Sequence, residues 1–242
     1  MRIFIEDSEQ AFFNAVAWQI ARQIILKPDS LIGLSTGRTT GPIHKALADI
    51  YKAHPFDTSH VTFFGLDEVT NVSRDYFGSC YYMLLHEVIE PLEVPLEHYI
   101  MPPTVSQDWE AECVRFETAL ARCGQVDLQV LGIGGNGHIG FNQPGTAFGQ
   151  TTWTSVMEPW LYERIRKETG APEGAPLGGV TLGIQNVMHS RRILLAANGA
   201  QKAEIMRAAV HGPVTENVPA SILQLHPDCD AYVDAAAGAL LK

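Results

Sequence analysis

The stretch Val126–Gly145 reads VDLQVLGIGGNGHIGFNQPG and joins an apolar run to a glycine-rich loop. Its first half, Leu128–Ile133, is an apolar run typical of a strand buried on both faces of a parallel sheet. The run ends in five glycines between Gly132 and Gly140. Loops of this kind open at the carboxyl edge of the sheet, where α/β proteins bind their ligands, so we expect the functional site here. The polar side chains of the loop are Asn136, His138, Asn142 and Gln143.

Apolar runs that predict strands alternate with helical periodicity along the rest of the chain. The other strands are expected at Arg2–Glu6, Leu31–Ser35, Val61–Leu66 and Arg192–Ala197, with a last edge strand within Ile222–Val233. This alternation predicts an α/β fold, with a mostly parallel sheet and helices on both faces, in a single domain spanning residues 1–242. Residues 146–179 show weaker periodicity apart from a helix near 160–167, and we interpret them as a flap over the site.

Composition narrows the class of protein. The 242 residues are 46% hydrophobic and carry a formal net charge of −10, which argues against nucleic acid or an anionic membrane as the main partner. No apolar run approaches the ~18 residues that span a bilayer, and the first residues do not resemble a secretory signal. The four cysteines are scattered without metal spacing, as expected of reduced thiols in a cytoplasmic protein.

The motif STGRTTG, Ser35–Gly41, lies between a predicted strand and a predicted helix. Its backbone N–H groups, its hydroxyls and the helix N-terminus can cradle a phosphate, and Arg38 can add a charge-assisted contact. The spacing is not that of a P-loop. The alternative is an ordinary strand-to-helix turn.

A second loop of this type, NGAQK, places Lys202 near the start of a helix. Positive charge there opposes the helix dipole, so a bound anion nearby would explain it. A solvated lysine is an equally good interpretation of this motif alone.

Asp67 follows directly on the apolar run VTFFGL. A carboxylate at the carboxyl end of a strand can act as a general base, although Asp67 could equally cap a helix or form a turn. We interpret the adjacent Glu68 as a neighbour of the base and not as a second catalytic group.

The stretch Val126–Gly145 also contains the pattern GxGxxG, formed by Gly132, Gly134 and Gly137. This pattern is the fingerprint of dinucleotide-binding loops. That fingerprint needs a helix immediately after the glycines, and the sequence HIGFNQPG is a poor helix start. We therefore do not expect NAD. A lone histidine is usually structural, but the position of His138 in a glycine loop at a strand end favours a functional role.

Four motifs, in this order, resemble those of the glucosamine-6-phosphate deaminase/isomerase family: STGRTTG, LDE, GIGGNGHIGFNQPG and NGAQKAEIMRAAV. The resemblance covers nearly the whole chain. GNGHIGFN separates this group from the related 6-phosphogluconolactonases, which share the glycine–histidine core but not the FN(E/Q)PG continuation. Members assigned to galactosamine 6-phosphate are also similar, so the sugar epimer stays open.

The resemblance implies a Rossmann-like fold and a reaction without metal or cofactor, in which glucosamine 6-phosphate becomes fructose 6-phosphate and ammonia. His138 would move a proton to or from the ring oxygen during ring opening, and Asp67 would carry a proton from C2 to C1. Lys202 would hold the phosphate together with Arg166 of the flap, or Arg164 in its place. The first phosphate loop would contribute Ser35, Thr36, Gly37, Arg38 and Thr39.

Two further positions of the ring-opening site, Asn136 and Gln143, depart from a common family pattern. Many members have Asp at the first position, although others also have Asn. At the second, the family Glu is replaced by Gln143, which can hydrogen-bond but carries no charge. A carboxylate there would orient the imidazole and raise its pKa. One pKa unit is about 1.4 kcal/mol, so ring opening roughly ten-fold slower is expected, and Gln143→Glu should raise turnover.

Two other functions stay open. A non-catalytic sugar-phosphate binding protein is favoured by Gln143 alone, and a 6-phosphogluconolactonase-type hydrolase would share the fold. In each case the expected partner is a small sugar phosphate, and the protein could be a monomer or a homo-oligomer.

Overall fold

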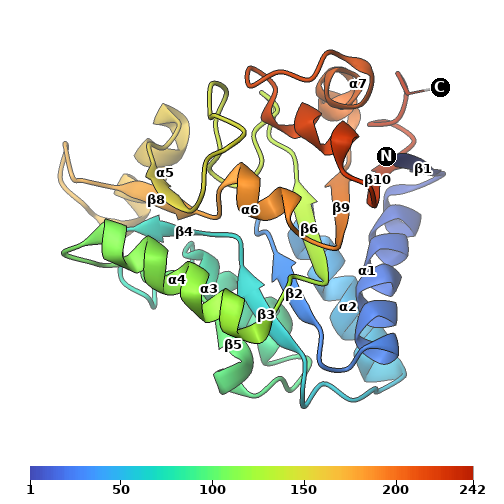
Figure 1. Ribbon diagram of the computed structural model, residues 1–242, viewed down its shortest axis with the longest axis horizontal. Helices are drawn as coiled ribbons and strands as arrows, with labels where there is room; N and C mark the ends of the chain where they lie inside the picture. Colours follow the sequence, from blue (N-terminus) through green and yellow to red (C-terminus); the bar gives the residue numbers. More distant parts are fainter. Residues whose placement is uncertain (242) are drawn as a thin grey trace.

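The computed structural model describes residues 1–241, and its centre is a seven-stranded parallel sheet (Figure 1). The strand order is β1-β10-β9-β6-β2-β3-β5, and every neighbouring pair is parallel. The predicted α/β fold with a mostly parallel sheet is confirmed. The strands are β1 Arg2–Glu6, β2 Leu31–Leu34, β3 Thr62–Gly65, β5 Tyr99–Ile100, β6 Leu128–Gly132, β9 Arg192–Ala197 and β10 Cys229–Asp234.

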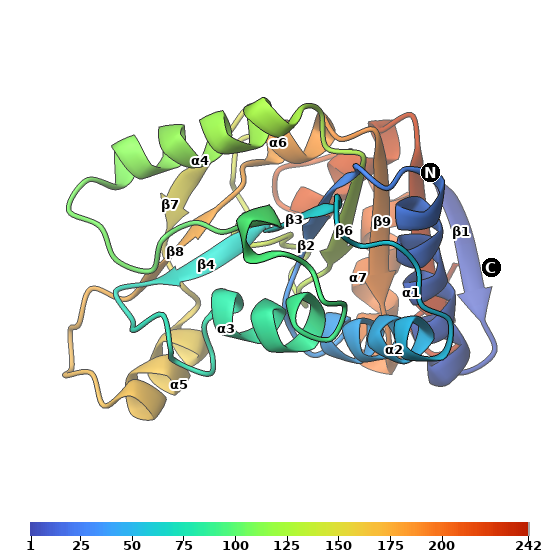
Figure 2. The same cartoon turned by 90° about the horizontal axis from the view of Figure 1, so that it is seen from below.

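Helices cover both faces of this sheet (Figure 2). One face packs against α1 Glu9–Leu26, α2 Thr40–Ala53, α3 Cys80–Leu84 and the π-helical turn η1 Leu85–Ile89. The other packs against α4 Trp109–Cys123, α6 Ile184–Met188, α7 Ala203–His211 and the 3₁₀ helix η4 Pro219–Leu225. Two short 3₁₀ turns complete the helical elements around the sheet, η2 Leu96–His98 and η3 Ala200–Lys202.

The central strand β6 shows why both faces of the sheet need a helical layer. In β6, Leu128 and Val130 belong to the core under α1 and α2, whereas Leu131 and the following Ile133 belong to the core under α4 and α7. All four side chains are buried. Because side chains alternate across a strand, a strand with apolar side chains on both of its faces is stable only between two helical layers.

The helix boundaries follow local capping chemistry. The hydroxyl oxygen of Ser8 accepts a hydrogen bond from the backbone N–H of Ala11 at 3.1 Å and starts α1. Asp108 starts α4 in the same way, at 3.0 Å from the N–H of Ala111.

The strand order reverses direction between β2 and β6. From β2 the chain moves to β3 and then β5, and from β6 it moves to β9 and then β10 on the other side. Loops that leave two such strands diverge, and the crevice between them is the usual ligand site of doubly wound sheets.

A second, three-stranded antiparallel sheet is absent from the sequence-based prediction. It has the order β4-β8-β7, with β4 Asp67–Thr70, β8 Gly178–Thr181 and β7 Trp153–Ser155. Leu66 connects the two sheets: its N–H donates to Leu34 O at 2.9 Å, and its carbonyl accepts from the N–H of Leu182 at 2.8 Å. Asp67 therefore stands at the junction of two sheets, where sequence reasoning placed a simple strand end.

The predicted flap contains more regular structure than its sequence indicated. Within residues 146–179 lie β7, the start of β8 and α5 Pro159–Thr169. In both views α5 and β8 lie at the end of the molecule remote from β1 (Figures 1 and 2).

The expectation of a C-terminal edge strand is wrong in one respect. β10 lies between β1 and β9, and β1 is the edge. Every residue of Cys229–Asp234 is buried, whereas β1 has a partly exposed pattern, as an edge position allows.

Candidate active site

Most of the predicted site residues, Arg166 excepted, follow strands of the large sheet at its carboxyl edge. His138 follows β6, the Ser35–Thr39 loop follows β2, and Asp67 follows β3. Because β2 lies between β6 and β3, its loop separates the histidine from the carboxylate. Lys202 follows β9, on the other side of β6.

The glycines of the β6 loop make room for the imidazole. A Cβ atom at Gly134 would lie 2.1 Å from His138 Cε1, so only glycine fits beneath the ring. The N–H of Gly134 also donates to the carbonyl of His138 at 2.9 Å, which closes the loop. The fingerprint-like spacing thus serves a histidine, and no helix follows these glycines within the segment.

Asn136 fixes the orientation of His138. Its Oδ1 lies 2.7 Å from His138 Nδ1 and also accepts from the backbone N–H of His138 at 3.1 Å. An amide oxygen can only accept, so Nδ1 carries the proton and the neutral ring keeps its lone pair on Nε2. His138 is thereby set to exchange a proton through Nε2.

Sequence reasoning missed one member of this group, Glu158. Its Oε1 accepts from Asn136 Nδ2 at 2.8 Å and lies 3.5 Å from His138 Nδ1. The indole N–H of Trp160 donates to its other oxygen. Glu158 is the residue before α5, with Pro159 in the first turn, so the local sequence indicates only a helix start.

Gln143 contacts Asn136: its Oε1 accepts from Asn136 Nδ2 at 3.1 Å. The neighbouring Asn142 is fully buried and donates to the carbonyls of Ile139 and Leu182 at 3.0 and 2.9 Å. Asn142 therefore holds the loop, while Gln143 belongs to the polar group around His138.

Burial lowers the pKa of His138 below its usual value. The carboxylate of Glu158 acts in the opposite direction, and the ammonium of Lys202 lowers the pKa further. The lowered pKa favours the neutral imidazole, which is the form that can accept a proton.

Asp67 is almost fully buried, and this burial raises the pKa of its carboxyl to about 7. The thiol of Cys80 donates to Asp67 Oδ1 at 3.7 Å, which lowers that pKa in part. The hydroxyl of Thr36 in turn donates to Cys80 Sγ at 3.2 Å. A carboxylate with a pKa near neutrality is well matched to proton abstraction at pH 7.

Glu68 has a different function from its neighbour. Its carboxylate accepts from the backbone N–H groups of Val69, Cys80 and Tyr81 at 2.7, 2.8 and 2.7 Å. It therefore fixes the start of α3 against β4, in agreement with its interpretation as a neighbour of the base.

The two predicted phosphate loops contact each other. The hydroxyl of Thr39 donates to Asn198 Oδ1 at 2.7 Å, and Lys202 Nζ donates to the carbonyl of Ile133 at 2.6 Å. Ser35 is buried and donates to Val130 O at 3.0 Å, whereas Gly37 and Arg38 are exposed. Thr36, Gly37 and Arg38 belong to the loop between β2 and α2, which ends at Thr40, the first residue of α2.

The flap arginines point to partners on their own helix. Arg166 Nη2 pairs with Glu163 at 2.9 Å, and Arg164 Nε pairs with Glu168 at 3.8 Å. Neither pair places an arginine on the phosphate loops, so the binding role of Arg166 stays a prediction.

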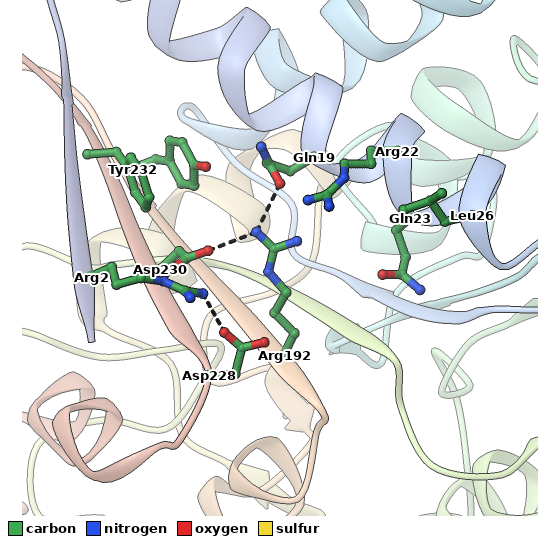
Figure 3. A pocket seen from close by; sticks show the side chains of 10 residues that line it. Arg2, Gln19, Arg22, Gln23, Leu26, Arg192, Asp228, Asp230 and Tyr232 are labelled. Atoms are coloured by element: carbon green, nitrogen blue, oxygen red, sulfur yellow. Dashed lines mark hydrogen bonds and ion pairs between the residues drawn. The ribbon is translucent and has the colours of Figure 1, made fainter.

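A hollow of about 540 Å³ lies at the opposite edge of the sheet (Figure 3). It is lined by Arg2, Arg192 and Asp230, among others, at the amino ends of β1, β9 and β10. Two of these arginines pair with one carboxylate: Arg192 Nη2 donates to Asp230 at 2.8 Å, and Arg2 forms an ion pair with the same side chain. Because the hollow lies at the amino ends of these strands, it is separate from the proton-transfer groups at the carboxyl edge of the sheet.

No cluster of three or more His, Cys, Asp or Glu side chains suited to a metal ion occurs among residues 1–241. In the same range, none of the helices combines the length and apolar character needed to cross a membrane.

The chain is similar in sequence and in fold to known proteins. The family model described as glucosamine-6-phosphate isomerases/6-phosphogluconolactonase matches residues 6–231. The chain belongs to this family. A glucosamine-6-phosphate deaminase of Clostridium botulinum (strain Loch Maree / Type A3) is 35% identical over 242 residues, which is 100% of this chain and 99% of that protein. One from Halothermothrix orenii is 35% identical, with full coverage of both.

Solved structures of proteins with the same names have a similar fold. A monomeric glucosamine-6-phosphate deaminase superposes with a TM-score of 0.92 at 31% identity, covering 99% of this chain and 100% of that one. A 6-phosphogluconolactonase from Trypanosoma cruzi reaches 0.80 at 17% identity, covering 100% and 97%. The second match reflects the shared fold.

Proposed function

We propose that this chain is a glucosamine-6-phosphate deaminase, which converts glucosamine 6-phosphate and water to fructose 6-phosphate and ammonia. The observation that carries the proposal is the placement of two proton-transfer groups, Asp67 and His138, on either side of one phosphate-type loop. The 35% sequence identity to glucosamine-6-phosphate deaminases over the full length of the chain supports it.

The substrate's own geometry fits this placement. In the pyranose ring, C5 carries both the ring oxygen and the phosphate arm, and C2 lies across the ring. Lys202 is close enough to His138 to influence its pKa, and Thr39 joins its loop to that of Lys202. A phosphate held by Lys202 and the Ser35–Thr39 loop would bring the ring oxygen to His138 and C2 to Asp67.

Ring opening is assigned to His138. Its Nε2 takes the proton from the O1 hydroxyl and returns a proton to the ring oxygen as the C1–O5 bond breaks, which leaves an open-chain aldehyde. Asn136 holds the tautomer that leaves Nε2 free. Gln143 accepts from the same Asn136 amide and keeps it in place.

Isomerisation is assigned to Asp67. The ionised carboxylate removes the proton from C2 while the aldehyde oxygen O1 takes up the proton that the substrate ammonium group loses, which gives an enolamine. The same carboxyl group then returns its proton to C1. The product is an imine at C2, which water hydrolyses to the ketone with release of ammonia. The buried Asp67 is suited to this shuttle because its pKa of about 7 lets it lose and regain a proton near neutral pH.

The remaining parts of the proposal concern the flap arginine, the class of partner, the location and the oligomeric state. Arg166 of α5 closes on the phosphate and completes its binding by Lys202 and the loop. The net charge of −10 favours a small-molecule partner over nucleic acid. The enzyme works in the cytoplasm as a monomer or homo-oligomer, with neither cofactor nor metal.

Measured ammonia release from glucosamine 6-phosphate tests the proposal, with galactosamine 6-phosphate as the epimer control. We expect turnover of the gluco epimer, and Asp67→Asn as a matched inactive variant. Hydrolysis of 6-phosphogluconolactone without ammonia release from either epimer would establish the lactonase alternative. Tight binding without any turnover would establish the non-catalytic one.

A further inference from the structure

The ring-opening group contains a carboxylate that comes from a different part of the chain. Position 143 is a glutamine, yet Glu158, the residue before α5, places Oε1 at 2.8 Å from Asn136 Nδ2 and 3.5 Å from His138 Nδ1. Gln143 Oε1 lies 3.1 Å from the same Asn136 nitrogen. Two side chains thus meet one amide, and only Glu158 is charged.

An ionised carboxylate has no proton to donate, so it fixes the neighbouring amide. The NH₂ group of Asn136 must face Glu158, and its oxygen must then face His138. That oxygen in turn requires a proton on Nδ1 of the imidazole. The carboxylate of Glu158 therefore determines, through one amide, which ring nitrogen of His138 is free for the substrate.

Charge balance accounts for the neutral side chains at positions 136 and 143. An aspartate in place of Asn136 would put a second carboxylate at hydrogen-bond distance from Glu158, and a glutamate in place of Gln143 would add one beside it. Like charges at this separation repel, although Asn136 is exposed and Glu158 half-buried, so solvent screens part of this repulsion. Asn136, Gln143 and Glu158 are compatible as a set.

We propose that Glu158 is the positioning carboxylate of ring opening, supplied by the flap to His138 through Asn136. This inference rests on the proposed deaminase function and adds a residue to it. The indole of Trp160 holds the second oxygen of Glu158, so the carboxylate is fixed from both sides. The charged groups that face His138 are Glu158 and Lys202.

The test is Glu158→Gln, with Glu173→Gln as the control for an equal charge change at an exposed position of the same segment. We expect kcat for glucosamine 6-phosphate to fall about 10- to 100-fold with little change in KM. Affinity for an acyclic amino-alditol 6-phosphate, which needs no ring opening, should not change. In ¹⁵N NMR of the imidazole, Glu158→Gln should lower the pKa of His138 and mix its two tautomers.

A second substitution, which returns a carboxylate to the site at position 143, distinguishes loss of the charge from a general structural effect. Gln143→Glu should restore most of the lost kcat in the Glu158→Gln background, and should gain less than about three-fold in the wild type, where two carboxylates would compete. A Glu158→Gln enzyme within two-fold of wild type, an equal loss in Glu173→Gln, or no rescue would overturn the assignment. Absence of ammonia release from the wild type would instead contradict the proposed function itself.

Discussion

The two sheets of this protein hold functional side chains in different ways. The large sheet presents His138, Lys202 and the Ser35–Thr39 loop on turns that follow buried parallel strands. The small sheet places Asp67 inside a strand pairing, opposite Thr181 of β8, and the segment after β7 carries Glu158. Asp67 could be inferred because it directly follows an apolar strand, whereas its pairing with β8 and the contact of Glu158 with Asn136 depend on residues distant in the sequence.

The largest expected effect lies at the small sheet. Asp67→Asn should reduce ammonia release by at least about 1,000-fold, because it removes the base for C2. The same change should stabilise the fold, because burial raises the folded-state pKa to about 7. The folded state keeps a proton that the unfolded chain loses above the ordinary pKa of 3.8, so stability falls as pH rises through this window.

Thermal unfolding of Asp67→Asn against wild type checks the stability effect. We expect a gain of about 1–3 kcal/mol at pH 8 and a smaller gain at pH 5. Burial raises the pKa of Glu68 to about 7 as well, but its carboxylate accepts three backbone N–H bonds, which lower that pKa in part. Glu68→Gln is therefore the contrasting variant: it turns an NH₂ group toward one of these N–H donors and should destabilise the fold. Equal effects of the two changes would contradict the different functions given to these neighbours.

The next effect belongs to the large sheet. Lys202→Met removes the ammonium and keeps an apolar stem, so kcat/KM for glucosamine 6-phosphate should fall about 100-fold, mainly through KM. The pKa of His138 should rise, because Lys202 lowers it in the wild type. Steady-state kinetics and imidazole NMR measure both, and Lys167→Met on the exposed part of α5 is the control. An unchanged KM would remove Lys202 from phosphate binding.

Replacement of the flap arginines should have a smaller effect. Arg166→Ala is expected to raise KM about ten-fold with kcat little changed, because it removes one charge-assisted contact to phosphate. Arg164→Ala should have less influence. The reverse order would assign the flap contact to Arg164, and no change in either variant would separate the flap from the phosphate.

The smallest effect concerns the thiol beside the base. Cys80→Ala removes the donor that lowers the pKa of Asp67, so the acidic limb of kcat/KM should move from about pH 7 to higher pH. Cys80→Ser keeps a donor and should retain most of the wild-type profile. The pH dependence of kcat/KM decides, and a shift toward lower pH in Cys80→Ala would show that the thiol does not stabilise the carboxylate.

Much of the large sheet could be predicted from sequence because its strands are buried on both faces and leave continuous apolar runs, as in Leu128–Ile133. The same patterns located His138 and Asp67. The two-residue β5 was too short to leave a pattern, and β4 was hidden because VTFFGLDEVT continues from one sheet into another. Glu158 had no local signal, because its function depends on a contact with Asn136, 22 positions away.

The position of Glu158 also bears on the order of events in a catalytic cycle. Opening the sugar ring exposes an aldehyde beside an amine, a combination that condenses readily with other nucleophiles. Because Glu158 directly precedes α5, one hydrogen bond to Asn136 ties the β6 loop to the segment that begins this helix. If Glu158 positions His138 as proposed, the group that would generate this aldehyde is built from both segments and is complete only where they meet.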